Sequence, residues 1–334
     1  MKMQAMVVKS PGAPDVFELS EVDVPQMRPG HLLVAVKATS VNPIDAKIRS
    51  KPLPFSPEFP AILHVDFAGI VKEVAPDVKN FKVGDAVYGV GGGIKGTIGG
   101  ALAEYHLVDA QLVSLMPTNL SFTEAATLPL VSITAWEALL DKMKLSSGDS
   151  LLVHGGLGGV GHIAAQLGKY IGAVVHTTVS SDEDKEASST LGADYPINYK
   201  TSTVAEYVDK YTAGRGFDCI FDTVGGPNLA NSFQAARYNG SIACIATGGT
   251  HDLSLMYVKG ISLHSVLMLI PLITGQHRAH YGRILFEIKK LVEAGKITPL
   301  IHSEVFDWKD ISKAHALLES GKYRGKIAVG VGNF

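Results

Sequence analysis

Cysteine is nearly absent from this sequence. Only Cys219 and Cys244 occur among its 334 residues. A structural zinc lobe built on cysteine needs at least three thiolates here, so the sequence excludes one. A framework of disulfides is not expected either, because two cysteines form at most one bridge.

An excess of charge of either sign is also missing. The chain has 30 Lys and Arg residues against 32 Asp and Glu residues, a formal net charge of −2. Proteins that bind nucleic acid or a membrane surface electrostatically carry a basic excess or patch. We therefore expect no nucleic-acid partner and no membrane partner, and any anionic ligand must be held by a local site.

Long hydrophobic runs are absent as well. The longest, Val266 to Ile273, spans eight residues and contains Pro271, well short of the ~20 residues that cross a bilayer. Only six uncharged residues separate Lys2 from Lys9, too few for the apolar core of a secretory signal. The sequence thus predicts no membrane span and a cytoplasmic location.

What is present is typical of a globular protein of about two domains. Hydrophobic residues make up 46% of the chain and charged residues 19%, which excludes a disordered or coiled-coil chain. Up to about Asn119, short β-type segments alternate with Pro and Gly, which predicts a small antiparallel barrel or sandwich.

From about Thr123 strands and helices alternate. This pattern is typical of βαβ units and predicts a doubly wound parallel sheet. The expected strands are 150–154, 173–179, 195–199 and 217–224, and the expected helices are 162–172, 183–192 and 204–214.

The last part of the chain returns to a mixed pattern. Residues 281–297 have the apolar spacing of an amphipathic helix that Gly295 would terminate, and residues 326–331 read as a strand. We expect this part to rejoin the first domain. The predicted division is a catalytic domain at 1–124, a dinucleotide-binding domain at 125–265, and a return to the catalytic domain at 266–334.

One motif carries recognisable chemistry. Gly156, Gly158 and Gly161 satisfy G-x-G-x-x-G between an expected strand and an expected helix, the context that the dinucleotide fingerprint requires. Glycines let the backbone approach a pyrophosphate, and the helix N-terminus supplies free N–H groups. The alternative is a tight glycine turn without a ligand. No Gly-Lys pair has P-loop spacing, so a P-loop is excluded.

The end of the second strand bears on the choice of dinucleotide. NAD-binding chains place Asp or Glu about 20 residues past the first glycine, but residues 176–180 contain no carboxylate. Ser180, Ser181 and Lys185 are candidates for binding a 2′-phosphate, although the acidic residues 182–184 oppose it. The sequence favours NADPH over NADH, with a solvated helix charge as the alternative for Lys185.

The motif order over nearly the whole chain resembles a known family. It is similar to the medium-chain dehydrogenase/reductases, in their zinc-independent quinone oxidoreductase (zeta-crystallin-like) branch. The resemblance implies an α/β protein in which a GroES-like, mostly-β catalytic domain surrounds an inserted Rossmann domain. The matching segments are 40–50, 67–89, 125–139, 151–161, 191–199, 221–226 and 314–329.

The resemblance also implies that zinc is not bound. Zinc-dependent relatives have a cysteine in the segment that here reads Ser40 to Pro43, and Gly-His-Glu where this chain has His64, Val65 and Asp66. The ligand position is therefore Val65, and a lone histidine does not make a zinc site, which needs three protein ligands. We expect His64 to be a packing or surface residue, with its backbone affected by the departure from Gly.

The catalytic residues implied by the resemblance are Asn42, Asp45 and Lys47. Without a metal, hydrogen-bond donors must stabilise the negative charge that hydride addition builds on the carbonyl oxygen. Asn42 is the preferred donor, and it also counts as a cofactor contact; its alternative role is to satisfy a turn backbone. Asp45 would order its neighbours. Lys47 stands where some relatives have a tyrosine, and Arg49 could be structural.

Residues 89–100 contain seven glycines. Such a segment suggests either a mobile rim loop of the substrate cleft or a plain surface loop.

Further cofactor contacts follow from the resemblance alone. They are Thr134, Gly159, Val160, Tyr199, Ala246, Thr247, Gly248, Leu267, Met268 and Lys326.

The leading hypothesis is an NADPH-dependent, zinc-independent reductase of a small-molecule quinone or α,β-unsaturated carbonyl. The alternatives are an alcohol dehydrogenase-type activity and a non-catalytic NADPH-binding protein. The alternating stretch 261–266 reads as an edge strand, and the family often extends its sheet across a dimer. We expect a homodimer.

Overall fold

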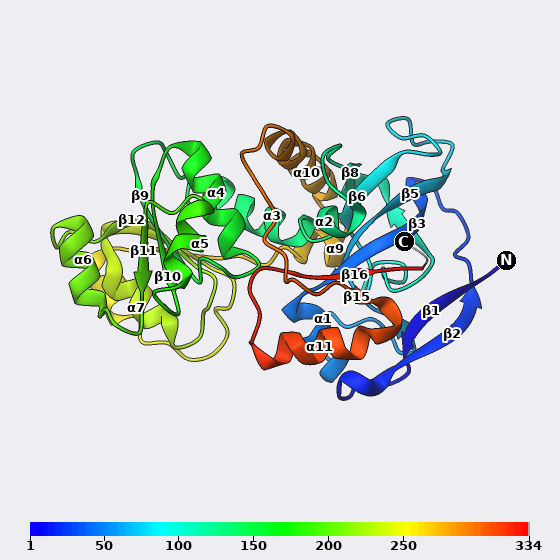
Figure 1. The fold of residues 1–334 in the computed structure, drawn as a ribbon, viewed down its shortest axis with the longest axis horizontal. Coiled ribbons are helices and arrows are strands. Elements are labelled where there is room, and N and C mark those ends of the chain that lie inside the picture. Colours follow the sequence, from blue (N-terminus) through cyan, green and yellow to red (C-terminus); the bar gives the residue numbers. More distant parts are fainter. Residues whose placement is uncertain (333–334) are drawn as a thin grey trace. The chain divides into compact units, whose positions relative to one another are not determined.

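The computed structural model describes residues 1–332, which fall into two compact units (Figure 1). Unit 1 comprises Met1–Leu130, Met268–Gly295 and the chain from Ile301 onward. Unit 2 comprises Val131–Leu267 and the five residues Lys296–Leu300. The division expected after residue 124 lies at Leu130 in the structure, and the expected C-terminal part contributes a short segment to unit 2.

Unit 1 is built on two sheets. The larger has the order β15-β16-β3-β5-β6-β8 with β7 also paired to β3, and the smaller has the order β2-β1-β4. All pairings are antiparallel except β15 with β16. The strands are β1 (Lys2–Val8), β2 (Phe17–Asp23), β3 (His31–Val41), β4 (Ala61–Ile62), β5 (Asp66–Val74), β6 (Ala86–Val90), β7 (Tyr105–Asp109), β8 (Val113–Leu115), β15 (Phe306–Asp307) and β16 (Ile327–Gly330).

The C-terminal strand completes this unit. β16 pairs antiparallel with β3, Ile327 opposite Val41, so residues 327–330 belong to the larger sheet of unit 1. The unit's helices are α1 (Pro43–Ser50), α2 (Phe122–Ala125), α9 (Ile270–Thr274), α10 (Arg278–Glu293) and α11 (Ile311–Ser320).

Helix α10 shows how the apolar spacing is used. Its buried residues include Ile284, Leu285, Ile288 and Val292, the face that the sequence pattern predicts. Gly295, with φ +65°, follows the helix end. The amphipathic helix is thus confirmed, and it starts three residues earlier than expected.

Unit 2 is a six-stranded parallel sheet of order β11-β10-β9-β12-β13-β14, which confirms the doubly wound prediction. Its strands are β9 (Ser150–His154), β10 (Val174–Val179), β11 (Tyr195–Asn198), β12 (Phe217–Asp222), β13 (Ala236–Cys244) and β14 (Ser262–Ser265). Its helices are α3 (Pro129–Trp136, starting in unit 1), a π-helical segment Glu137–Lys142, α4 (Gly161–Ile171), α5 (Asp184–Thr190), α6 (Val204–Thr212), α7 (Asn228–Ala235) and α8 (Ser254–Lys259).

Strand β12 ends earlier than its apolar run suggests. The carboxylate of Asp222 accepts hydrogen bonds from the backbone N–H groups of Val224 and Gly225. Such a side-chain turn competes with the sheet ladder. Residues 223–224, expected in the strand, therefore lie in the loop that follows it.

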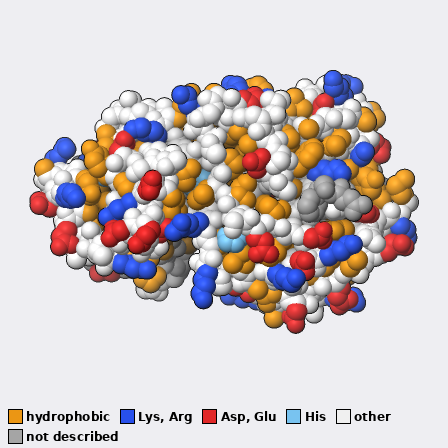
Figure 2. Space-filling model, viewed as in Figure 1, with side chains coloured by type: hydrophobic (Ala, Val, Ile, Leu, Met, Phe, Trp, Pro, Cys, Tyr) orange, Lys and Arg blue, Asp and Glu red, His pale blue; other side chains and the backbone are white. Residues whose placement is uncertain are grey.

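One face of the molecule carries charged side chains of both signs. On the face shown in Figure 2, acidic and basic side chains are interspersed. Within residues 1–332, no helix is long and apolar enough to cross a membrane.

Candidate functional site

The glycine motif forms the turn between β9 and α4 in unit 2. Gly155 has φ +77°, a conformation that favours glycine. A Cβ on Gly156 would lie 2.5 Å from Cβ of Thr177, and one on Gly161 would overlap the carbonyl oxygen of Gly155. Only glycine allows the helix start to pack this closely onto the turn.

The turn lies where the strand order of the sheet reverses. β9 has β10 on one side and β12 on the other, and ligands of open α/β sheets bind in the crevice at such a point. The Thr223 hydroxyl after β12 donates to the carbonyl oxygen of His154 at 2.6 Å. In the first turn of α4, the N–H groups of His162 and Ala164 donate to carbonyl oxygens just before the helix, and the helix dipole at this end favours an anion.

His154, the last residue of β9, was missed by the sequence reasoning. Its Nε2 is buried without a hydrogen-bond partner within residues 1–332, and burial lowers the pKa of the ring. A polar residue at the carboxyl end of an apolar strand was the available signal. An unpartnered buried nitrogen beside the glycine turn is the kind of atom that a bound ligand satisfies.

The residues expected to bind a 2′-phosphate gather at the end of β10, but each has an acidic neighbour. Ser180 donates from Oγ to Asp184 Oδ2 at 2.9 Å. The ammonium of Lys185 lies 2.6 Å from Asp182 Oδ1, and the two side chains are 41% and 64% exposed. The hydrogen bond from Lys185 lowers the pKa of Asp182.

The other expected cofactor contacts of unit 2 follow strand ends or lie inside α3. Tyr199 follows β11 and donates its backbone N–H to Val179 at 3.2 Å. Residues 246–248 follow β13 and Leu267 follows β14, whereas Thr134 is buried in α3. Because carboxyl ends of parallel strands share one edge, the strand-end residues lie on the edge that carries the glycine turn. Asn42, Met268 and Lys326 belong to unit 1.

Asn42 stands at the start of α1 in a buried polar cluster. Its side-chain Nδ2 donates to Asp66 Oδ2 at 2.8 Å, and its Oδ1 accepts a hydrogen bond from the Lys326 ammonium. Lys326 also donates to the carbonyl oxygen of Val41 at 3.2 Å. Asn42 is 1% exposed and Lys326 3%, so the amide is fixed at both ends.

Asp66, at the start of β5, is the centre of this cluster. Its carboxylate accepts hydrogen bonds from Ser40 Oγ at 2.8 Å, from Asn42, and from the backbone N–H of Leu130 at 2.8 Å. The Lys326 ammonium lies 3.4 Å away. Sequence reasoning treated Asp66 only as a departure from a metal-ligand pattern; a carboxylate in the otherwise apolar run before Gly69 was the signal for a buried site.

Asp45 and Lys47 lie on different faces of α1. The Asp45 carboxylate accepts the backbone N–H of Asn42 at 2.8 Å in a capping box that starts the helix. Burial, with the Asp66 charge adding to it, raises the pKa of Asp45 to about 7. Lys47 is exposed and Arg49 is buried, so the structure places Asp45 but not the Lys47 side chain in the Asn42 cluster.

The residues at the expected metal position are His64, Val65 and Asp66. Val65 supplies no donor, and the buried His64 has its Nε2 3.0 Å from Nε2 of His315. Within residues 1–332, no group of three or more His, Cys, Asp or Glu side chains could hold a metal ion. His64 has φ +76°, the left-handed conformation that suits the Gly of relatives.

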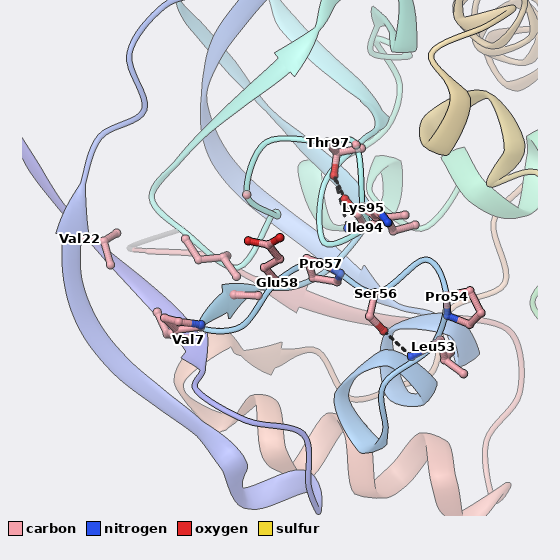
Figure 3. A pocket seen from close by; sticks show the side chains of 15 residues that line it. Val7, Val22, Leu53, Pro54, Ser56, Pro57, Glu58, Ile94, Lys95 and Thr97 are labelled. Carbon is pink, nitrogen blue, oxygen red and sulfur yellow. Dashed lines mark hydrogen bonds between the residues drawn. The ribbon is translucent and has the colours of Figure 1, made fainter.

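A cavity of about 690 Å³ opens in unit 1 beside the glycine-rich loop 89–100 (Figure 3), within the size range of small-molecule sites. Ile94, Lys95 and Thr97 line it together with residues 53–62. Two hydrogen bonds join the loop to other segments of unit 1. The backbone N–H of Lys95 donates to the carbonyl oxygen of Phe55 at 3.0 Å, and the Arg278 guanidinium donates to the carbonyl oxygen of Gly96 at 3.2 Å.

Comparisons with known proteins agree with this architecture. Residues 28–118 match the alcohol dehydrogenase GroES-like domain, and residues 191–329 match the zinc-binding dehydrogenase family. A zinc-type alcohol dehydrogenase-like protein of Staphylococcus epidermidis is 33% identical, with 94% of each chain covered. The 2-methylene-furan-3-one reductase of Solanum lycopersicum is 34% identical over 98% of this chain and 79% of its own.

Solved structures extend the likeness to the whole fold. An alcohol dehydrogenase superfamily protein from Novosphingobium aromaticivorans is 39% identical, with a TM-score of 0.93 over 99% of this chain and 100% of its own. The Escherichia coli quinone oxidoreductase, solved with NADPH, is 25% identical, with a TM-score of 0.83 over 98% and 99% of the two chains. The chain belongs to the medium-chain dehydrogenase/reductase superfamily, in its zeta-crystallin-like branch.

Proposed function

We propose that this oxidoreductase transfers a hydride from NADPH to an α,β-unsaturated carbonyl or a quinone, without zinc. The observation that carries the proposal is the glycine turn at the point where the parallel sheet reverses its strand order, which is where this fold binds dinucleotides. The furanone reductase and the quinone oxidoreductase among the relatives support the substrate class.

The chain has groups that fit the parts of this cofactor, which supplies the hydride when bound. The N-terminus of α4 and the glycine turn before it suit a pyrophosphate. Ser180, Ser181 and Lys185 suit a 2′-phosphate. The ion pair of Lys185 with Asp182 reduces the attraction, so the preference for NADPH over NADH is expected to be several-fold rather than absolute.

Asn42 is the proposed donor to the substrate oxygen. Hydride addition builds negative charge there, and a fixed donor stabilises it. One N–H of the Asn42 amide is bonded to Asp66, which leaves the second N–H for the substrate. The Lys326 ammonium on the amide oxygen polarises the amide, so that this second N–H donates more strongly.

In this proposal Lys326 has the electrostatic role that the metal has in zinc-dependent relatives, because it places positive charge near the reacting oxygen. It does so through Asn42 rather than by direct contact. Asp66 balances the charge of Lys326, because an unpaired ammonium would be costly to bury. An alcohol dehydrogenase activity that depends on zinc has no ligand set among residues 1–332 to support it.

The test is NADPH oxidation by protein purified without chelator or added zinc, followed across a panel of quinones and enones. We expect turnover with at least one acceptor, unchanged after exhaustive chelation. Gly161→Ala is the matched control, because its Cβ would overlap Gly155 and close the cofactor turn. Tight NADPH binding without turnover on any acceptor favours a non-catalytic binding protein, and loss of activity on chelation with recovery in zinc favours an alcohol dehydrogenase.

A further inference from the structure

Four buried side chains of unit 1 form a continuous series of hydrogen bonds that ends on the main chain of Asp66. Nε of Arg49 donates to Nδ1 of His315 at 3.3 Å, and Nε2 of His315 lies 3.0 Å from Nε2 of His64. Nδ1 of His64 lies 3.1 Å from Oγ1 of Thr39, which donates to the carbonyl oxygen of Asp66 at 2.6 Å. All four side chains are at most 1% exposed.

The donors in this series can be arranged in only one direction. A guanidinium has no acceptor, so Nδ1 of His315 must accept and its proton must sit on Nε2. That proton points at His64, whose Nε2 must therefore accept, leaving the His64 proton on Nδ1. Nδ1–H then donates to Thr39, whose own hydrogen is directed to Asp66. Each ring nitrogen takes part in one hydrogen bond of the series, and Oγ1 of Thr39 both accepts and donates.

Neither imidazole can carry a second proton in this arrangement. A proton on Nδ1 of His315 would face Arg49, and a proton on Nε2 of His64 would face the N–H of His315. Burial lowers the pKa of His315 to about 3 and that of His64 well below its usual value. Both rings are thus neutral, and their tautomers are fixed by Arg49 at one end and Thr39 at the other.

The backbone of His64 indicates that its side chain has a role. Its φ of +76° favours glycine, and a bulky residue there is strained. Core packing alone would not require an imidazole at this position. The hydrogen bonds of His64 to His315 and Thr39 hold the side chain in place despite this strain.

We propose that His64 and His315 are positioning residues. Through this series of hydrogen bonds, whose donors all point in one direction, they hold the main chain of Asp66 in place relative to Asn42 and Lys326. Asp66 accepts Thr39 on its main chain, and Ser40 and Asn42 on its carboxylate. A shift of its main chain therefore moves the carboxylate that orients the Asn42 amide. The expected effect on kcat rests on the proposed function, whereas the expected tautomers of His64 and His315 do not.

The tautomers are tested directly by imidazole nitrogen NMR on the full-length protein labelled with 15N-histidine. We expect His315 as the Nε2–H tautomer and His64 as the Nδ1–H tautomer at neutral pH, unchanged on mild acidification. The opposite tautomer for either ring, or a doubly protonated ring, would overturn the proposal.

Thr39→Val and Thr39→Ser form the matched pair for the positioning role. Valine removes the hydroxyl at nearly equal volume, and serine keeps it. We expect Thr39→Val to lower kcat at least five-fold with little change in KM for NADPH. It should also shift the NMR signal of the Asn42 side-chain amide, and His64 should no longer be restricted to the Nδ1–H tautomer. Thr39→Ser should restore all three.

A second pair covers the case in which Thr39→Val fails to fold. His315→Gln offers an oxygen to Arg49 and an N–H to His64, whereas His315→Met offers neither, so only His315→Met should lower kcat and shift the Asn42 signal. Equal effects of both members of either pair would mean a packing role and overturn the proposal. If the wild-type protein reduces no acceptor, the proposed function fails, while the tautomers and the Asn42 signal still decide this inference.

Discussion

The ammonium nitrogen of Lys326 lies 3.4 Å from Oδ2 of Asp66, and both side chains are almost completely removed from solvent. Burial lowers the pKa of Lys326, and the charges of Asp66 and Asp45 oppose that shift. A buried pair of this kind adds little net stability, but the loss of one member leaves the other uncompensated.

Lys326→Met should therefore destabilise unit 1 strongly. It leaves the carboxylate of Asp66 buried without its ammonium, a loss of ~3–5 kcal/mol in the free energy of unfolding, measured by urea denaturation. Lys322→Met, at an exposed position, is the control. Lys326→Met with Asp66→Asn should recover much of the loss, and a single substitution that costs less than ~1 kcal/mol would show that the pair is not buried in solution.

Asn42→Ala should lower turnover strongly while NADPH affinity stays within a few-fold. The variant lacks the proposed donor to the substrate oxygen, and removal of one such donor costs ~10²-fold in rate. Asn42→Asp should be worse, because it places a carboxylate beside the developing negative charge and beside Asp66. Steady-state kinetics on the best acceptor and titration with NADPH separate the two effects.

Two results would contradict this role of Asn42. Unchanged turnover in Asn42→Ala would mean that the side chain only caps α1 and is not the donor to the substrate oxygen. A collapse of NADPH binding would mean that Asn42 acts on the cofactor.

The preference for NADPH should respond in opposite directions to two neighbouring substitutions. Lys185→Ala removes the cation proposed for the 2′-phosphate and should shrink the preference. Asp182→Asn removes the carboxylate that lies 2.6 Å from Lys185 and should enlarge it. Paired titrations with NADPH and NADH measure both. If neither substitution changes the ratio of the affinities for NADPH and NADH, the residues at the end of β10 do not bind the 2′-phosphate.

Asp45 should make the protein less stable as the pH rises. Its pKa is about 7 in the folded state, against 3.8 as its ordinary value. Between these values the folded state holds a proton that the unfolded state has released, so the contribution of Asp45 to stability is lost as the pH rises. Asp45→Asn removes this dependence and keeps an acceptor for the backbone N–H of Asn42.

Thermal unfolding at about pH 5 and about pH 8 checks this prediction. The Tm of Asp45→Asn relative to wild type should be higher at the alkaline pH than at the acidic one. Asp209→Asn, on the exposed surface of α6, should show no such trend. A relative Tm that falls with pH would mean that Asp45 is ionised in the folded protein throughout this range.

A homodimer is expected to form along the free edge of β14. β14 is an edge strand of the sheet, and the N–H of Val266 donates to Cys244 within the chain at 2.9 Å. Val266→Pro would therefore break an internal bond. Because N–H groups alternate along a strand, that of Ser265 faces the free edge. Ser265→Pro should convert a dimer to a monomer in sedimentation, and a wild-type mass that stays monomeric at every concentration would refute the dimer.

Local sequence patterns predicted much of the fold. The glycine turn, the alternation of strands and helices in unit 2 and the apolar face of α10 each depend on residues within one or two elements. Spacing alone therefore reveals them. The end of β12 was predicted too late, because the Asp222 side chain competes with the sheet there.

The candidate site depends on contacts that no local pattern contains. Asn42 and Lys326 are 284 positions apart, and His64 and His315 are 251 apart. Sequence reasoning named Asn42 and Lys326 from family resemblance but could not pair them, and it expected His64 to be a packing or surface residue. The non-glycine residue at a glycine position was the only local sign that His64 was unusual.

The pairing of β16 with β3 has a consequence for how the protein is made. Most of unit 2 is one continuous stretch, residues 131–267, which residues 296–300 join from later in the sequence. Unit 1 requires segments from both parts of the sequence, because its long strand β3 lacks β16, and Asp66 lacks Lys326, until residues 326–330 are present. A nascent or truncated chain would therefore hold an unpaired strand edge beside an uncompensated carboxylate. Truncation before Lys326 would therefore disturb Asp66, which lies 260 positions earlier in the sequence.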